Sequence, residues 1–166
     1  MTYLIYGLGG MGGTSYGGNE LGHGYEGINI SDPIICQRAF TVNKLKECLF
    51  KEKIILIRSP PMAGKTSLAQ LLEKQLLTDC PDMRIIRISL LWMEDDDPNW
   101  KFSDRFSWLM GGTGWHQFVA ECSYIETVLI VDEVQKIYRL DSENAEPHHE
   151  GKEFWNTFKD IQQYIL

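Results

Sequence analysis

Long apolar runs are absent from this chain of 166 residues, and none approaches the ~20 residues that a membrane-spanning helix requires. Cys-x-x-Cys pairs are also absent: the four cysteines are widely spaced, which argues against a metal or disulfide framework and favours reduced thiols. Basic residues are few, and the net charge of −7 gives no electrostatic reason to bind nucleic acid. No basic region followed by an apolar core marks the N-terminus as a secretion signal. These absences predict a soluble intracellular protein, cytoplasmic or nuclear, with no membrane or nucleic-acid partner.

Lysine and arginine are missing altogether from residues 1–27, which hold 10 of the 15 glycines. Gly7 to Gly12 matches the G-x-G-x-x-G pattern of dinucleotide-binding proteins and follows a run, Thr2 to Tyr6, that is compatible with a strand. That kind of site requires a helix directly after the glycines, and the following residues are too rich in glycine to form one. The sequence therefore predicts a flexible glycine-rich segment over residues 1–30 and one domain over residues 31–166.

The most informative segment runs from Lys53 to Leu68 and reads KIILIRSPPMAGKTSL. An apolar run short enough for one buried strand stops at a Ser-Pro-Pro turn, and Gly-Lys-Thr then leads into leucines at helical spacing. Strand, tight loop and helix in this order form a phosphate cradle, because the amides of the loop and first helical turn converge on an anion. We interpret the segment as a Walker A element, which binds a nucleoside triphosphate.

Each residue type in this loop suits phosphate binding. Gly64 lets the backbone approach closely, Lys65 reaches the β- and γ-phosphate oxygens, and the Thr66 hydroxyl is a ligand for Mg²⁺. The Lys65 side chain is expected to be solvated when no nucleotide is bound. Ser59, also assigned to the site, stands where the usual pattern has its first glycine, so the loop enters with ordinary dihedrals or with strain. Because the two prolines carry no N–H, the amide donors are expected from Met62, Ala63, Gly64, Lys65, Thr66 and Ser67.

A second β-branched run, Thr127 to Glu133, ends in two carboxylates, and the first of them, Asp132, stands 67 residues after Lys65. A strand that ends in Asp puts this carboxylate at the carboxyl edge of a parallel sheet, where open α/β folds bind ligands. Asp132 is predicted to hold Mg²⁺ through water, and Glu133 to polarise the attacking water as general base. The alternative is a buried strand with a solvated acidic end, and the Walker A segment upstream favours the functional interpretation.

Strands and helices alternate along the rest of the chain, which predicts an α/β fold with a mainly parallel sheet. Strands are expected over residues 54–58, 85–90 and 128–132. Helices are expected after Thr66 and over residues 43–51, 115–122 and 152–166.

The two motifs resemble a known class of proteins. Ser-Pro-Pro-Met-Ala-Gly-Lys-Thr-Ser-Leu, with Leu-Ile-Val-Asp-Glu-Val-Gln downstream, resembles the P-loop ATPase module of AAA+ and STAND proteins. More specifically, residues 34–166 are similar to the NTPase domains of Crinkler-type proteins of fungi and oomycetes. The resemblance implies a three-layer P-loop NTPase core, ATP and Mg²⁺ as cofactors, and Lys65 and Glu133 as catalytic residues. It also implies a place in a longer chain, with self-association or a fused effector domain.

Compared with this class, the chain stops early after the Walker B segment. Nothing corresponds to the next strand with its sensor residue, to an arginine finger or to a lid domain. In the class, that next strand lies between the two Walker strands, so the sheet is expected to be incomplete at its C-terminus. The Walker strands would then pair directly or leave a cleft between them. The alternatives to an ATPase are a non-catalytic nucleotide-gated interaction module and a non-functional fragment of a longer effector protein.

Overall fold

A computed structural model of the chain describes residues 27–60, 62–90, 101–134, 154–156 and 158–159, and the backbone of residues 2–7. The elements in chain order are β1 (Thr2–Gly7), α1 (Ala39–Glu52), β2 (Ile54–Ile57), α2 (Lys65–Asp79), β3 (Arg84–Ser89), α3 (Phe102–Leu109), α4 (Trp115–Glu121) and β4 (Thr127–Asp132). Residues 154–156 and 158–159 are also helical.

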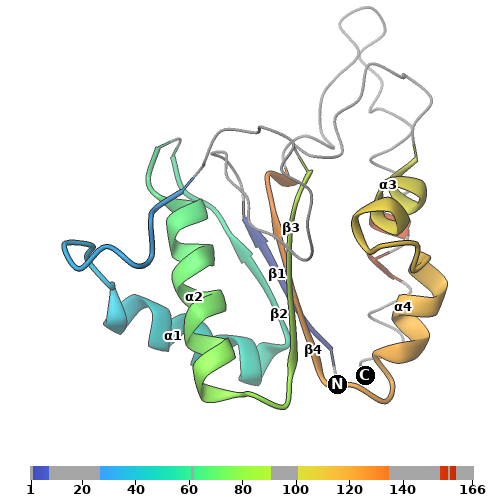
Figure 1. The fold of residues 1–166 in the computed structure, drawn as a ribbon, viewed down its shortest axis with the longest axis horizontal. Coiled ribbons are helices and arrows are strands. Elements are labelled where there is room, and N and C mark those ends of the chain that lie inside the picture. Colours follow the sequence, from blue (N-terminus) through green and yellow to red (C-terminus); the bar gives the residue numbers. More distant parts are fainter. Residues whose placement is uncertain are drawn as a thin grey trace, which may run out of the picture.

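The four strands form one parallel sheet in the order β2-β1-β4-β3. Ile5 of β1 lies opposite Ile55 of β2 on one side and opposite Ile130 of β4 on the other. On the far side of β4, Val131 lies opposite Ile88 of β3. Helices α1 and α2 cover one face of the sheet, and α3 and α4 lie on the other (Figure 1). The predicted α/β fold with a parallel sheet is confirmed.

The N-terminal strand occupies the place where the sequence predicted a gap. Strand β1 lies between β2 and β4 and is hydrogen-bonded to both, so β2 and β4 neither pair directly nor leave a cleft. The predicted flexible segment over residues 1–30 is therefore wrong for β1. It is also wrong at its other end, where the Ile28 N–H donates a hydrogen bond to Gln70 Oε1 at 2.9 Å. The glycines of residues 8–26 lie outside the described residues.

Strand periodicity divides the buried side chains into two clusters, one on each face of the sheet. Along β4, Val128 and Ile130 face α1 and α2, whereas Leu129 and Val131 face the opposite side. The aliphatic cluster consists of Val42, Leu49, Leu68, Leu71, Leu72, Leu76, Ile85, Val128 and Ile130. The aromatic cluster contains Phe102, Phe106, Trp115, Phe118, Phe154 and Phe158, together with aliphatic residues of β3 and β4.

The helices follow the sequence pattern with one exception. The helices predicted over residues 43–51 and 115–122 correspond to α1 and α4, and the leucines after Thr66 are buried along α2. Helix α3 was not predicted, although its two buried residues, Phe102 and Phe106, stand four positions apart, at helical spacing. The helix predicted over residues 152–166 is helical where it is described. Among the described helices, none combines the length and the apolarity needed to cross a membrane.

Candidate functional site

The loop from β2 to α2 lies at the carboxyl edge of the sheet, towards which all four parallel strands run (Figure 1). Gly64 is the N-cap residue of α2 and has φ 75° and ψ 36°. Glycine adopts this left-handed conformation without steric cost, so Gly64 turns the loop directly into the helix. The N-cap residue makes no side-chain hydrogen bond, and the Leu68 N–H donates to the Gly64 carbonyl at 2.9 Å. A helix N-terminus without a side-chain cap favours an anion.

Ser59, which stands where the predicted Walker pattern has its first glycine, does not adopt a positive φ. The non-glycine residues with positive φ that the structure describes do not include Ser59. The positive φ of the loop falls instead on Met62, with φ 58° and a side chain that is 99% exposed. The loop therefore enters with ordinary dihedrals, the first of the two alternatives that the sequence left open.

The Lys65 side chain folds back over the loop. Its Nζ donates hydrogen bonds to the carbonyl oxygens of Ser59 at 2.9 Å and of Pro60 at 2.8 Å. The residue is only 5% exposed, so the expectation of a solvated lysine is wrong. The loop carbonyls hold the ammonium group at the N-terminus of α2.

Strand periodicity brings Asp132 to the first turn of α2. Asp132 ends β4 on the face of Val128 and Ile130, which α2 covers. The Thr66 side chain, one residue into α2, hydrogen-bonds to the Asp132 carboxylate. Both residues are buried, with exposed fractions of 5% for Thr66 and 0% for Asp132. The two predicted magnesium-binding residues therefore lie in contact, although 66 positions separate them in the chain.

Burial raises the pKa of the Asp132 carboxyl above its ordinary value. The Thr66 hydrogen bond, the Glu133 backbone N–H and the positive charges of Arg87 and Lys65 oppose this rise. The Glu133 N–H donates to Asp132 Oδ1 at 2.9 Å. Asp132 Oδ2 is buried and accepts no hydrogen bond from the described residues. A buried carboxylate oxygen in this state is suited to a hydrated Mg²⁺ ion, which binds oxygen ligands.

Glu133 leaves β4 in a strained conformation. Its φ is 61°, in the left-handed region, and the residue is 3% exposed. A non-glycine residue in such a region costs on the order of 1–3 kcal/mol, and strain of this kind clusters at active sites and switch regions. The turn aims the Glu133 N–H at Asp132, which orients the preceding carboxylate.

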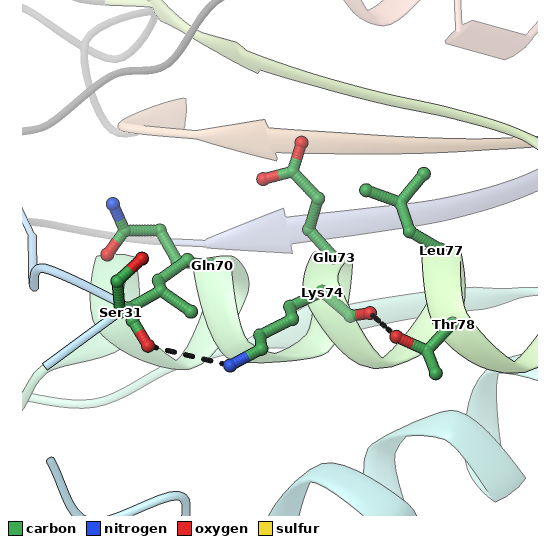
Figure 2. A pocket seen from close by; sticks show the side chains of 7 residues that line it. Ser31, Gln70, Glu73, Lys74, Leu77 and Thr78 are labelled. Atoms are coloured by element: carbon green, nitrogen blue, oxygen red, sulfur yellow. Dashed lines mark hydrogen bonds between the residues drawn. The ribbon is translucent and has the colours of Figure 1, made fainter. Parts of the chain in front are cut away.

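A separate hollow of about 450 Å³ lies beside α2 and does not involve the loop between β2 and α2 (Figure 2). Lys74 extends from α2 towards residues 27–31, which cross the helix, and its Nζ donates to the Ile30 carbonyl at 3.5 Å. Glu73 points towards the strands. Gln70 binds the same segment through the Ile28 N–H. The hollow therefore marks where residues 27–31 cross the helix, and we assign it a packing role.

The structure brings Lys65, Thr66 and Asp132 together, and leaves Met62 pointing into solvent. The prediction from the sequence did not include two arginines near the site. These are Arg87, whose charge acts on Asp132, and Arg38, whose guanidinium lies next to Gly64. The signal for Arg87 was a charged residue inside an apolar strand.

No cluster of three or more His, Cys, Asp and Glu residues suited to a metal occurs in the described ranges. Comparison with known proteins found no matching family model, curated protein or solved structure.

Proposed function

We propose that this protein binds a nucleoside triphosphate, with ATP as the first candidate, together with Mg²⁺. The observation that carries the proposal is the buried contact between Thr66 of the phosphate loop and Asp132 at the end of β4. A loop hydroxyl and a strand-end carboxylate on one magnesium ion are the two protein ligands that a P-loop site requires. The same contact would have no obvious role in a protein whose acidic strand end was merely solvated.

The side chains around this contact have separate roles. Lys65 exchanges its bonds to the loop carbonyls for bonds to phosphate oxygens, and its charge offsets theirs. Thr66 and Asp132 would hold Mg²⁺, which supplies positive charge to the phosphates when it is bound. The backbone amides at the start of α2 orient the phosphate chain.

The order of the strands supports a P-loop core of the AAA+/STAND kind, similar to the NTPase modules of Crinkler-type proteins. In that class one strand separates the Walker A strand from the Walker B strand. Here β1 separates β2 from β4. An N-terminal strand thus takes the position that a later strand holds in the class, and the two Walker segments keep their spacing.

Calorimetric titration with Mg-ATP tests the proposal. Lys65→Ala should weaken binding by about 2–3 kcal/mol, on the scale of charge-assisted hydrogen bonds. Lys74→Ala is the matched control, because it removes a cation from the same helix away from the loop and should bind like the wild type. Equal affinity of the wild type and Lys65→Ala would overturn the Walker A assignment.

Hydrolysis is the second part of the proposal, with Glu133 as the general base. The strained turn at Glu133 also favours a second candidate, a nucleotide-gated switch that holds ATP without rapid turnover. Single-turnover experiments distinguish the two: an ATPase forms product, and Glu133→Gln abolishes product formation while Mg-ATP binding persists. Binding without product in the wild type would instead support the switch.

A further inference from the structure

A positively charged side chain from outside the Walker motifs lies against the phosphate loop. A Cβ placed on Gly64 would meet the Arg38 guanidinium, at 3.2 Å from Nη2, 3.5 Å from Nη1 and 3.6 Å from Cζ. Arg38 is the residue just before α1, so 26 positions separate it from Gly64 in the chain. Two cations, Arg38 and Lys65, therefore flank the residue at which the loop becomes α2.

The guanidinium of Arg38 is positioned but not neutralised. Arg38 is exposed, and within the part of the chain that the structure describes its side chain forms no ion pair or hydrogen bond. Its backbone has φ 45° and ψ 35°, a left-handed conformation that costs a non-glycine residue free energy. An arginine held in a strained conformation beside an uncapped helix N-terminus is suited to a ligand with several negative oxygens.

We propose that Arg38 is a second phosphate-binding cation, supplied by the same chain to the nucleotide whose binding is proposed above. The planar guanidinium donates two parallel N–H bonds to phosphate oxygens, a geometry that the Lys65 ammonium cannot provide. The buried Asp132 carboxylate, with Oδ2 lacking a hydrogen bond from the described residues, lies near the first turn of α2 as the magnesium-binding group. The nucleotide phosphates would then receive positive charge from two segments of the chain. Arg38 lies just before α1, and Lys65 lies at the start of α2.

Titration of Mg-ATP and of adenosine into Arg38→Ala tests this inference. We expect the affinity for Mg-ATP to fall about 10- to 100-fold, since a charged hydrogen-bond pair is lost. The affinity for adenosine should not change, because adenosine has no phosphate. Arg38→Lys should recover part of the loss, because it restores the charge without the fork. Lys51→Ala removes a cation from the last turn of the same helix and should bind as the wild type does.

Arg38→Gly distinguishes phosphate binding from a purely structural role, in which binding of Mg-ATP would follow the stability of the variant. Glycine tolerates the left-handed conformation, so this variant should melt at a higher temperature than the wild type without nucleotide, yet bind Mg-ATP as weakly as Arg38→Ala. Unchanged Mg-ATP affinity of Arg38→Ala, with Lys65→Ala impaired, would overturn the role of Arg38 and leave the proposed function standing. A loss confined to adenosine would assign Arg38 to the nucleoside and also overturn the inference. Unchanged affinity of both alanine variants would overturn both proposals.

Discussion

The two faces of the sheet are built from different chemistry. The face beneath α1 and α2 is packed with leucine, isoleucine and valine, whereas the face beneath α3 and α4 is packed with phenylalanine and tryptophan together with aliphatic residues of β3 and β4. The buried charged side chains of β3 and β4, Arg87 and Asp132, both lie on the aliphatic face with α2. On the aromatic face, ring centroids approach within 4.2 Å for Phe154 and Phe158 and 5.0 Å for Phe106 and Phe118.

Because of this difference, the residues of the candidate site lie on one face of the sheet and the aromatic cluster that stabilises it lies on the other. A period of two along β4 sends every second side chain to α2, so one face carries both a hydrophobic cluster and the polar groups at its carboxyl edge. The other face receives large rings, whose burial and edge contacts stabilise the sheet, and Arg84 lies over the Phe118 ring while it forms an ion pair with Glu121 of α4. Substitutions on the two faces should therefore affect folding and nucleotide binding in different proportions.

Interrupting β1 should have the largest effect, because this strand supports both faces from within the sheet. Ile5→Pro removes a backbone N–H from a strand that is paired on both sides, and we expect a loss of about 3 kcal/mol or more, or of cooperative unfolding altogether. Thr2→Pro is the matched control, because proline is tolerated at the first position of a strand. Urea unfolding measures both. Similar curves for the two variants would show that β1 is not essential to the sheet.

Truncating a ring on the aromatic face should lower stability without altering the site. Phe118→Ala removes a fully buried ring that contacts Phe106 and Trp115, at an expected cost of about 3–5 kcal/mol in unfolding free energy. The rise in melting temperature on adding Mg-ATP should persist, since α4 takes no part in the loop. Trp108→Ala, at a side chain that is 63% exposed, should change stability by about 0.5 kcal/mol or less. Loss of the nucleotide-dependent rise in Phe118→Ala would show that the two faces are coupled.

Breaking the ion pair on the aliphatic face should cost slightly less. Arg87 Nε donates to Glu73 Oε2 at 2.7 Å, with the Arg87 side chain fully buried and that of Glu73 20% exposed. Glu73→Gln leaves the arginine charge without its carboxylate and should cost about 3 kcal/mol. The double variant Arg87→Met with Glu73→Leu should recover most of this loss, because apolar side chains replace both charges. If the losses of the single variants Arg87→Met and Glu73→Leu add up to the loss of this double variant, the pair contributes no coupling energy.

The smallest expected effect is the pH dependence that comes from Asp132. Burial raises its pKa in the folded state, so the folded protein binds this proton more tightly than the unfolded chain does. Without nucleotide, the stability of the wild type relative to Asp132→Asn should fall as the pH rises from the ordinary value of 3.8 through the raised pKa. Urea unfolding across this window measures the difference, and exposed Asp82 supplies the control variant Asp82→Asn. A difference that did not change with pH would contradict the role of burial.

The local half of the candidate site could be read from the sequence. The strand, the tight loop and α2 are contiguous, so spacing alone predicted the turn from β2 into α2 and the positions of Gly64, Lys65 and Thr66 at the start of that helix. The contact with Asp132 was predicted as well, because parallel strands end at one edge of the sheet. The inward fold of Lys65 was missed, since nothing in the local pattern shows that the Ser59 and Pro60 carbonyls lie within its reach.

Apart from β1 and α3, the type of each described element could be predicted from the sequence itself, because alternation and helical spacing are local properties of the chain. The tertiary structure decided which strand stands between β2 and β4 and which charges gather at the loop between β2 and α2. Residues 2–7 are compatible with a strand by composition, but their place depends on the unpaired backbone groups of β2 and β4, which another strand must satisfy. Likewise, Arg38 reaches Gly64 only because α1 packs beside α2. Neither the place of β1 in the sheet nor the contact of Arg38 with Gly64 can be predicted from local residue spacing, since each joins segments far apart in the chain.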